Sequence, residues 1–248
     1  MKKSLLIIVC LIGYSQIFAV DIYWYLAASL SKPGKVIVKN FNRTEKAFQV
    51  YLIIGGSGQL LGQLTASKKG DIYTPASESF LQKAENKGFL KSYQVLVHQT
   101  PVFGLSKEGE KTIKTFDDLH RKTVKIALGN SMTMALGKSY LEIEKRMNRE
   151  NAKGIRKNSI VQAININQIV NYLRSDIVGA GLVFDTVARA NRFRWVSIPK
   201  YANIQQQAYF TVLTFSNHPE KVGAFQKYLF QQDEVFHKFG FKLLHESL

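Results

Sequence analysis

Short β-rich runs alternate with helical segments along almost the whole sequence, and this order constrains the fold more than any other feature. In residues 31–44, for example, Val36, Val38 and Phe41 recur at helical spacing after Pro33, which suits a first helical turn. Strands are expected at residues 21–27, 48–54, 71–74, 93–98, 102–105, 124–128, 177–184 and 208–215. Helices are expected at residues 31–44, 59–67, 77–86, 116–121, 135–149, 166–174, 219–230 and 233–244. The alternation predicts an α/β fold with largely parallel sheets covered by helices.

The same pattern begins again near residue 102, after the strand expected at residues 93–98. This restart predicts a second lobe. The sequence contains no internal repeat at fixed spacing, no low-complexity stretch and no flexible linker. Two lobes without a linker are expected when the chain crosses between them more than once.

Residues 1–19 have the features of a secretory signal peptide. Two lysines lead, an apolar run follows at residues 5–12, and small residues come near Ala19. The apolar run is far shorter than the roughly 20 residues that a transmembrane helix needs. We therefore expect cleavage before Val20 and export to the periplasm. Cys10, the only cysteine, would leave with the peptide, although a lipid anchor at Cys10 is the alternative.

The chain is strongly basic, with 34 Lys and Arg residues against 18 Asp and Glu residues and a formal net charge of +16. Such a balance raises the question of nucleic acid. The basic residues are scattered, however, and no nucleic-acid recognition motif is present, so nucleic acid is not expected as a partner. A solvated basic surface explains the charge, and attraction of anionic ligands or of an acidic envelope partner is the alternative.

Candidate catalytic and metal-binding patterns are weak. Ser57 lies in Gly55-Gly56-Ser57-Gly58-Gln59, which lacks the last glycine of a Gly-x-Ser-x-Gly nucleophile turn. The five histidines are scattered without the spacing of metal ligands. The sequence therefore favours a protein that is not an enzyme and that uses neither a metal nor a cofactor.

Small and polar residues precede several expected helices, at residues 27–30, 55–58, 129–137 and 165–166. Helix N-termini carry unpaired N–H groups and partial positive charge, so several of them meeting in one cleft would hold an anion. The alternative for each serine is an ordinary helix cap.

Several segments, in their order and spacing, resemble the periplasmic molybdate-binding proteins of ABC importers. They cover nearly the whole mature chain: Ala27-Ala28-Ser29-Leu30, Gly55-Gly56-Ser57-Gly58-Gln59-Leu60, Gly70-Asp71-Ile72-Tyr73, Asp118-Leu119, Val124-Lys125-Ile126-Ala127-Leu128-Gly129, Ala180-Gly181-Leu182-Val183-Phe184 and Phe239-Gly240-Phe241. The resemblance implies a two-lobed periplasmic binding protein of type II, in which each lobe is a mixed, mostly parallel sheet flanked by helices and the ligand cleft lies between the lobes. It also implies a first lobe of residues 20–101 and 205–248, a second lobe of residues 102–204, and hinges near residues 98–102 and 204–208.

The resemblance further implies a monomer that binds a small tetrahedral oxyanion, molybdate first and tungstate next, and passes it to an ABC permease in the inner membrane. Ser29 and Ser57 match the two serines of that family's site, and Ile166 falls at a position where the family uses only the backbone. Two positions depart from the family. Leu136 replaces a small residue in a Pro-Ala-Gly turn, and Phe184 replaces a tyrosine that donates its hydroxyl. These departures leave open another anion such as sulfate, or a diverged envelope-associated interaction protein on the same fold.

Overall fold

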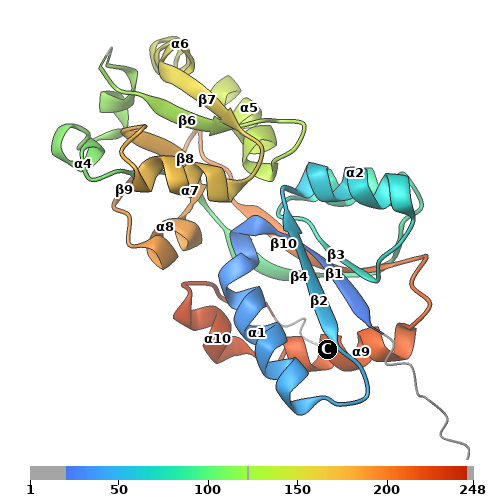
Figure 1. Cartoon of the computed structure of the whole chain (residues 1–248). Helices are drawn as coiled ribbons and strands as arrows, with labels where there is room; N and C mark the ends of the chain where they lie inside the picture. Colours follow the sequence, from blue (N-terminus) through green and yellow to red (C-terminus); the bar gives the residue numbers. More distant parts are fainter. Residues whose placement is uncertain (1–20, 122, 245–248) are drawn as a thin grey trace, which may run out of the picture.

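The computed structural model describes residues 21–121 and 123–244, which form two five-stranded sheets flanked by helices (Figure 1). The proposed signal peptide and Cys10 lie outside the described residues. Among the residues that are described, no helix combines the length and the apolar composition needed to cross a membrane. The predicted α/β fold with two lobes is confirmed.

The first sheet has the strand order β2-β1-β3-β10-β4. Its strands are β1 (Ile22–Ala27), β2 (Val50–Gly55), β3 (Ile72–Thr74), β4 (Leu90–Gln99) and β10 (Gln206–Leu213). The helices of this lobe are the short 3-10 helix η1 (Ala28–Leu30), α1 (Ser31–Thr44), α2 (Ser57–Ser67), α3 (Glu78–Glu85), α9 (Pro219–Leu229) and α10 (Asp233–Lys238). Trp24 lies at the centre of the core, where its ring packs at 5.3 Å from Phe225 and its Nε1 donates to Thr74 Oγ1 at 2.8 Å.

The second sheet has the strand order β7-β6-β8-β5-β9. Its strands are β5 (Pro101–Leu105), β6 (Ile126–Gly129), β7 (Ser159–Ala163), β8 (Ala180–Phe184) and β9 (Trp195–Ser197). The helices of this lobe are α4 (Gly109–Thr112), the 3-10 helix η2 (Phe116–His120), α5 (Ala135–Arg146), α6 (Arg149–Asn158), α7 (Ile166–Arg174) and α8 (Asp185–Asn191). Every residue of β8 is buried, because helices cover both of its faces.

Both sheets are mixed. In the first sheet β10 runs antiparallel to β3 and β4, and in the second sheet β5 runs antiparallel to β8 and β9. Within the described residues, the remaining pairings between strands are parallel, and an isolated antiparallel bridge joins Val97 to Leu243. Each reversed strand is the first strand that the chain forms after it crosses from the other sheet.

The two crossings lie side by side. Only Thr100 separates β4 from β5, and Gln206 at the start of β10 pairs with Gln99 at the end of β4. Asp185 fixes the first crossing, because its Oδ1 accepts from the Thr100 N–H at 2.9 Å and its own N–H donates to Thr100 O at 2.8 Å. The chain therefore passes between the lobes through two adjacent strands.

Two helices end several residues earlier than the sequence predicted. The helix predicted at residues 233–244 ends at Lys238, because Gly240 has a φ of 80° and closes a Schellman motif. In this motif the Phe241 N–H donates to Phe236 O at 3.0 Å, and the two rings pack at 6.2 Å. The helix predicted at residues 135–149 ends at Arg146, and a new helix follows because Asn148 Oδ1 accepts from the Asn151 N–H at 2.8 Å.

Candidate functional site

A small cavity lies between the two lobes. It measures about 20 Å³, counted as the space open to the centre of a water-sized sphere. A cavity of this size admits only a small, compact ligand. The lining residues are Ala27, Ala28, Ser29, Gly55, Gly56, Ser57, Ala76, Met134, Ala135, Leu136, Ile166 and Phe184.

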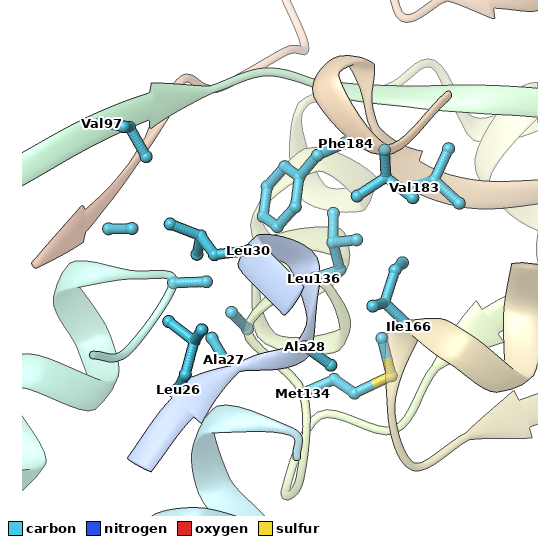
Figure 2. Packing of buried hydrophobic residues seen from close by; sticks show 14 of the residues in the cluster. Leu26, Ala27, Ala28, Leu30, Val97, Met134, Leu136, Ile166, Val183 and Phe184 are labelled. Atoms are coloured by element: carbon cyan, nitrogen blue, oxygen red, sulfur yellow. The ribbon is translucent and has the colours of Figure 1, made fainter. Parts of the chain in front are cut away.

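The structure brings all five predicted site residues to this cavity. Ser29 lies in η1, Ser57 is the first residue of α2, and Leu136 is the second residue of α5. Ile166 is the first residue of α7, and Phe184 is the last residue of β8. Figure 2 shows Ala28, Met134, Leu136 and Ile166 around a common space, with the Phe184 ring directed toward Leu30 and Leu136. Both lobes therefore contribute to one site.

Helix N-termini supply the electrostatics of the site. α2, α5 and α7 all begin at the cavity, and η1 leads into α1 beside them. The first N–H groups of a helix have no carbonyl partner inside the helix, and they carry partial positive charge. No charged side chain within residues 21–121 and 123–244 lines the cavity. An anion bound there would be held by N–H dipoles and hydroxyl groups rather than by a countercharge.

Local sequence explains why these helices begin at the cavity. Asn165 caps α7, because its Oδ1 accepts from the Gln168 N–H at 3.2 Å. At the start of α2, Gln59 Oε1 accepts from the Gly56 N–H at 3.3 Å, which is half of a capping box. Each of these helices directly follows a strand or a short turn, so its N-terminus lies at the cleft edge of its sheet.

The two serine hydroxyls have different partners. Ser57 Oγ accepts from the Ala76 N–H at 3.1 Å, so its own proton is free to point at a ligand. Tyr73 holds the same turn, because its hydroxyl donates to Ser57 O at 2.8 Å. Burial raises the pKa of Tyr73 well above its ordinary value, which keeps this hydroxyl a neutral donor. Ser29 Oγ is buried and has no hydrogen-bond partner among the described residues.

Gly56 and Gly58 bring the lobes into contact. The Gly58 N–H donates to Thr133 O of the second lobe at 2.9 Å, so this N–H is not available to a ligand. A Cβ atom on Gly56 would overlap Thr133 O and Ile164 O, and a Cβ atom on Gly58 would overlap Met132 O. The glycines therefore permit a close approach of backbone to backbone across the cleft.

Sequence reasoning did not identify Ala76 and Met134 as part of the site. Ala76 contributes the N–H group that orients Ser57, and Met134 is the cap residue of α5, buried against the cavity. Neither residue belongs to a type that signals binding. The one sequence signal for Met134 is its place immediately before the helix predicted from residue 135.

The sequence matches the model of the family described as "Bacterial extracellular solute-binding protein" over residues 22–242. It is 23% identical to the molybdate-binding protein ModA of Mycobacterium tuberculosis over 198 residues, which are 79% of this chain and 73% of that protein. The structure superposes on the sulfate-binding protein SubI of M. tuberculosis with a TM-score of 0.77, at 15% identity, over 92% of this chain and 88% of that one. It superposes on the molybdate-binding protein of Azotobacter vinelandii with a TM-score of 0.75, at 12% identity, over 90% of this chain and 100% of that one. At these identities the structural likeness shows a shared fold.

Proposed function

Because the chain belongs to the bacterial extracellular solute-binding proteins, we propose that it captures a tetrahedral oxyanion outside the cytoplasm and delivers it to an ABC importer. Molybdate is the ligand to test first, followed by tungstate. The relatives named above are described as binding molybdate or sulfate, which supports this class of ligand. We further propose a periplasmic monomer that makes and breaks no covalent bond.

The single observation that carries the proposal is the uncharged cavity at which the helices begin. A dianion that loses its water must receive a hydrogen bond at nearly every oxygen that faces the protein. The start of η1 and the first turns of α2, α5 and α7 offer N–H donors, and Ser29 and Ser57 offer hydroxyl donors. The donors come from both lobes, so a bound ion would hold the lobes closed.

The balance of donors and acceptors favours a fully ionised oxyanion. Molybdate, tungstate and sulfate have no proton to donate at neutral pH, whereas a large part of phosphate does. No carboxylate in the described part of the chain lines the cavity, and Ser57 Oγ already accepts one hydrogen bond. A protonated oxyanion would bury a donor with few acceptors, which costs about 1–3 kcal/mol. Phosphate should therefore bind more weakly than molybdate.

Melting curves and isothermal titration calorimetry with molybdate, tungstate, sulfate, phosphate and small carboxylates would test the proposal. A ligand present at 100 times its Kd should stabilise the folded protein by about 2.7 kcal/mol, seen as a rise in Tm. We expect molybdate and tungstate to give the largest rise. Phosphate or a monocarboxylate that stabilises more than molybdate would contradict the choice of ligand.

The second candidate function is an envelope-associated interaction protein on the same fold. Phe184 and the net charge of +16 favour it, because Phe184 gives the site no donor and the charge suits an acidic partner. This candidate predicts that none of the oxyanions raises the Tm at millimolar concentration. The same melting curves therefore separate the two functions.

A further inference from the structure

A second and larger cavity lies beside the oxyanion cavity, and we name it the basic chamber. It measures about 240 Å³ on the same scale and shares Ala28, Ser29 and Ile166 with the oxyanion cavity. Its walls come from α1 of the first lobe, from α7 and α8 of the second lobe, and from Phe241, which follows α10. The remaining lining residues are Ser31, Lys32, Pro33, Lys35, Asn167, Val170, Asn171, Arg174, Val187, Ala190 and Asn191.

Three cations face this chamber. Lys32 and Lys35 come from α1, and Arg174 is the last residue of α7. Within the described ranges, no Asp or Glu lines the chamber, and none of the three cations forms an ion pair. The chamber therefore concentrates uncompensated positive charge between the lobes.

Two hydrogen bonds position Lys32 and Arg174, one of them across the cleft and the other within the second lobe. Lys32 Nζ of the first lobe donates to Ala190 O in α8 of the second lobe. Arg174 Nη2 donates to Asn191 Oδ1 at 2.7 Å, which fixes its guanidinium beside α8. Burial lowers the pKa of Lys32, and the charges of Arg174 and Arg192 lower it further. Like charges therefore lie near one another here, and an anion between them would offset this repulsion.

We propose that the basic chamber is a second anion-binding site, which takes a carboxylate or phosphate group and joins the two lobes. The proposal rests on the proposed function, because the chamber adjoins the oxyanion cavity. The anionic group in the chamber has one of two sources. It is a substituent of an organic ligand whose oxyanion group occupies the small cavity, or it is a separate inorganic ion. The apolar side chains of Pro33, Val170 and Val187 suit the carbon chain of an organic ligand, and the asparagine amides can hydrogen-bond to its polar groups.

Two matched ligands test whether the chamber binds a substituent of an organic ligand. Methyl phosphate and 2-phosphoglycolate are both phosphate esters, and only 2-phosphoglycolate carries a carboxylate. Isothermal titration should show that 2-phosphoglycolate binds at least about tenfold more tightly than methyl phosphate, because its carboxylate adds a charge-assisted hydrogen bond. Lys35→Gln and Arg174→Gln should each remove most of this advantage and leave the affinity of methyl phosphate for the small oxyanion cavity unchanged. Lys153→Gln, the same change at an exposed residue of α6, should keep the advantage.

A titration with molybdate tests whether the chamber binds a separate inorganic ion. If it does, the unaltered protein should bind two molybdate ions per chain, and Lys35→Gln and Arg174→Gln should each bind one. Lys35 is exposed, so Lys35→Gln should fold normally even where Arg174→Gln loses the contact with Asn191. Two results together would overturn the proposal. The protein would bind the two esters with equal affinity, and it would bind one molybdate per chain both unaltered and as Lys35→Gln.

Ser57→Ala separates the two proposals, because Ser57 lines the oxyanion cavity and not the chamber. If the chamber proposal alone fails, molybdate binding persists, depends on Ser57 and is indifferent to Lys35. If the oxyanion proposal alone fails, binding of 2-phosphoglycolate or molybdate depends on Lys35 and Arg174 and is indifferent to Ser57.

Discussion

Two serines that look equivalent in the sequence have different surroundings in the cavity. Ser57 is 2% exposed and its Oγ already accepts the Ala76 N–H at 3.1 Å. Ser29 Oγ is buried without a partner in the part of the chain that the structure describes. A buried hydroxyl without a partner costs free energy until a ligand satisfies it. The same substitution should therefore change folding stability differently at the two positions.

We predict that Ser29→Ala and Ser57→Ala each weaken oxyanion binding. Each removes a hydroxyl donor to a charged ligand, worth about 1.5–3 kcal/mol, so affinity should fall roughly 10- to 150-fold. Ser57→Ala should also destabilise the ligand-free protein by about 1–3 kcal/mol, because the Ala76 N–H loses its acceptor. Ser29→Ala should not. Calorimetry and melting curves measure both effects, and unchanged affinity in both folded variants would remove the serines from the site.

Phe184→Tyr should tighten molybdate binding by about 1 kcal/mol, roughly fivefold. Phe184 is 2% exposed and lines the cavity, and its ring supplies no hydrogen bond to an anion. A tyrosine hydroxyl would add a direct charge-assisted bond, and its gain is below the full value because a water is displaced. Titration calorimetry gives the affinity of the variant.

Phe103→Tyr is the matched control, because Phe103 is fully buried in the second lobe beside Phe116 and does not line the cavity. Its added hydroxyl should lower stability by about 1–3 kcal/mol without a change in affinity. If Phe184→Tyr behaves in the same way, its hydroxyl does not reach the ligand.

At the scale of secondary-structure elements, the N-terminus of α2 decides how closely the lobes approach. Gly56 precedes this helix, and a Cβ atom there would overlap the carbonyl oxygens of Thr133 and Ile164 in the opposite lobe. The φ of Gly56 is −67°, which any residue adopts, so the constraint is the space between the lobes and not backbone strain.

We predict that Gly56→Ala weakens oxyanion binding by at least about tenfold, because the lobes can no longer close fully. The stability of the ligand-free protein should change little, since each lobe keeps its own core. Gly62→Ala is the control in the same helix, where an added Cβ atom meets nothing within 4 Å. That variant should keep its affinity and gain about 0.5–1 kcal/mol of stability. A Gly56→Ala protein with unaltered affinity would show that closure is not required for binding.

At the scale of the whole molecule, we predict that the exported protein begins near Val20 and contains no cysteine. The predicted signal at residues 1–19 lies outside the described residues, and Cys10 lies within it. Intact-mass measurement should show the exported protein lighter than its precursor by the mass of residues 1–19. A lipid-modified Cys10 at the new N-terminus would contradict this prediction and favour a membrane-anchored form.

The sequence alone determined the features that depend on local signals. α1 and α7 have the predicted bounds, residues 31–44 and 166–174, because apolar spacing and the residues at their first turns mark them. The alternation of strands and helices determined the α/β class. The resemblance to molybdate-binding proteins implied the five site residues, and the structure places all five around one cavity.

Only the tertiary structure decided the features that depend on contacts between distant segments. β7 and β9 were not predicted, since they are short and partly exposed and exist through pairing with β6 and β5. The reversal of β5 and β10 follows from the crossings between lobes. The basic chamber is lined by both Lys32 and Arg174, which are far apart in sequence and lie on different lobes. A local sequence pattern specifies a helix or a strand. The free energy of pairing two strands, or of packing the two sides of a cleft, depends on a second segment that lies elsewhere in the sequence.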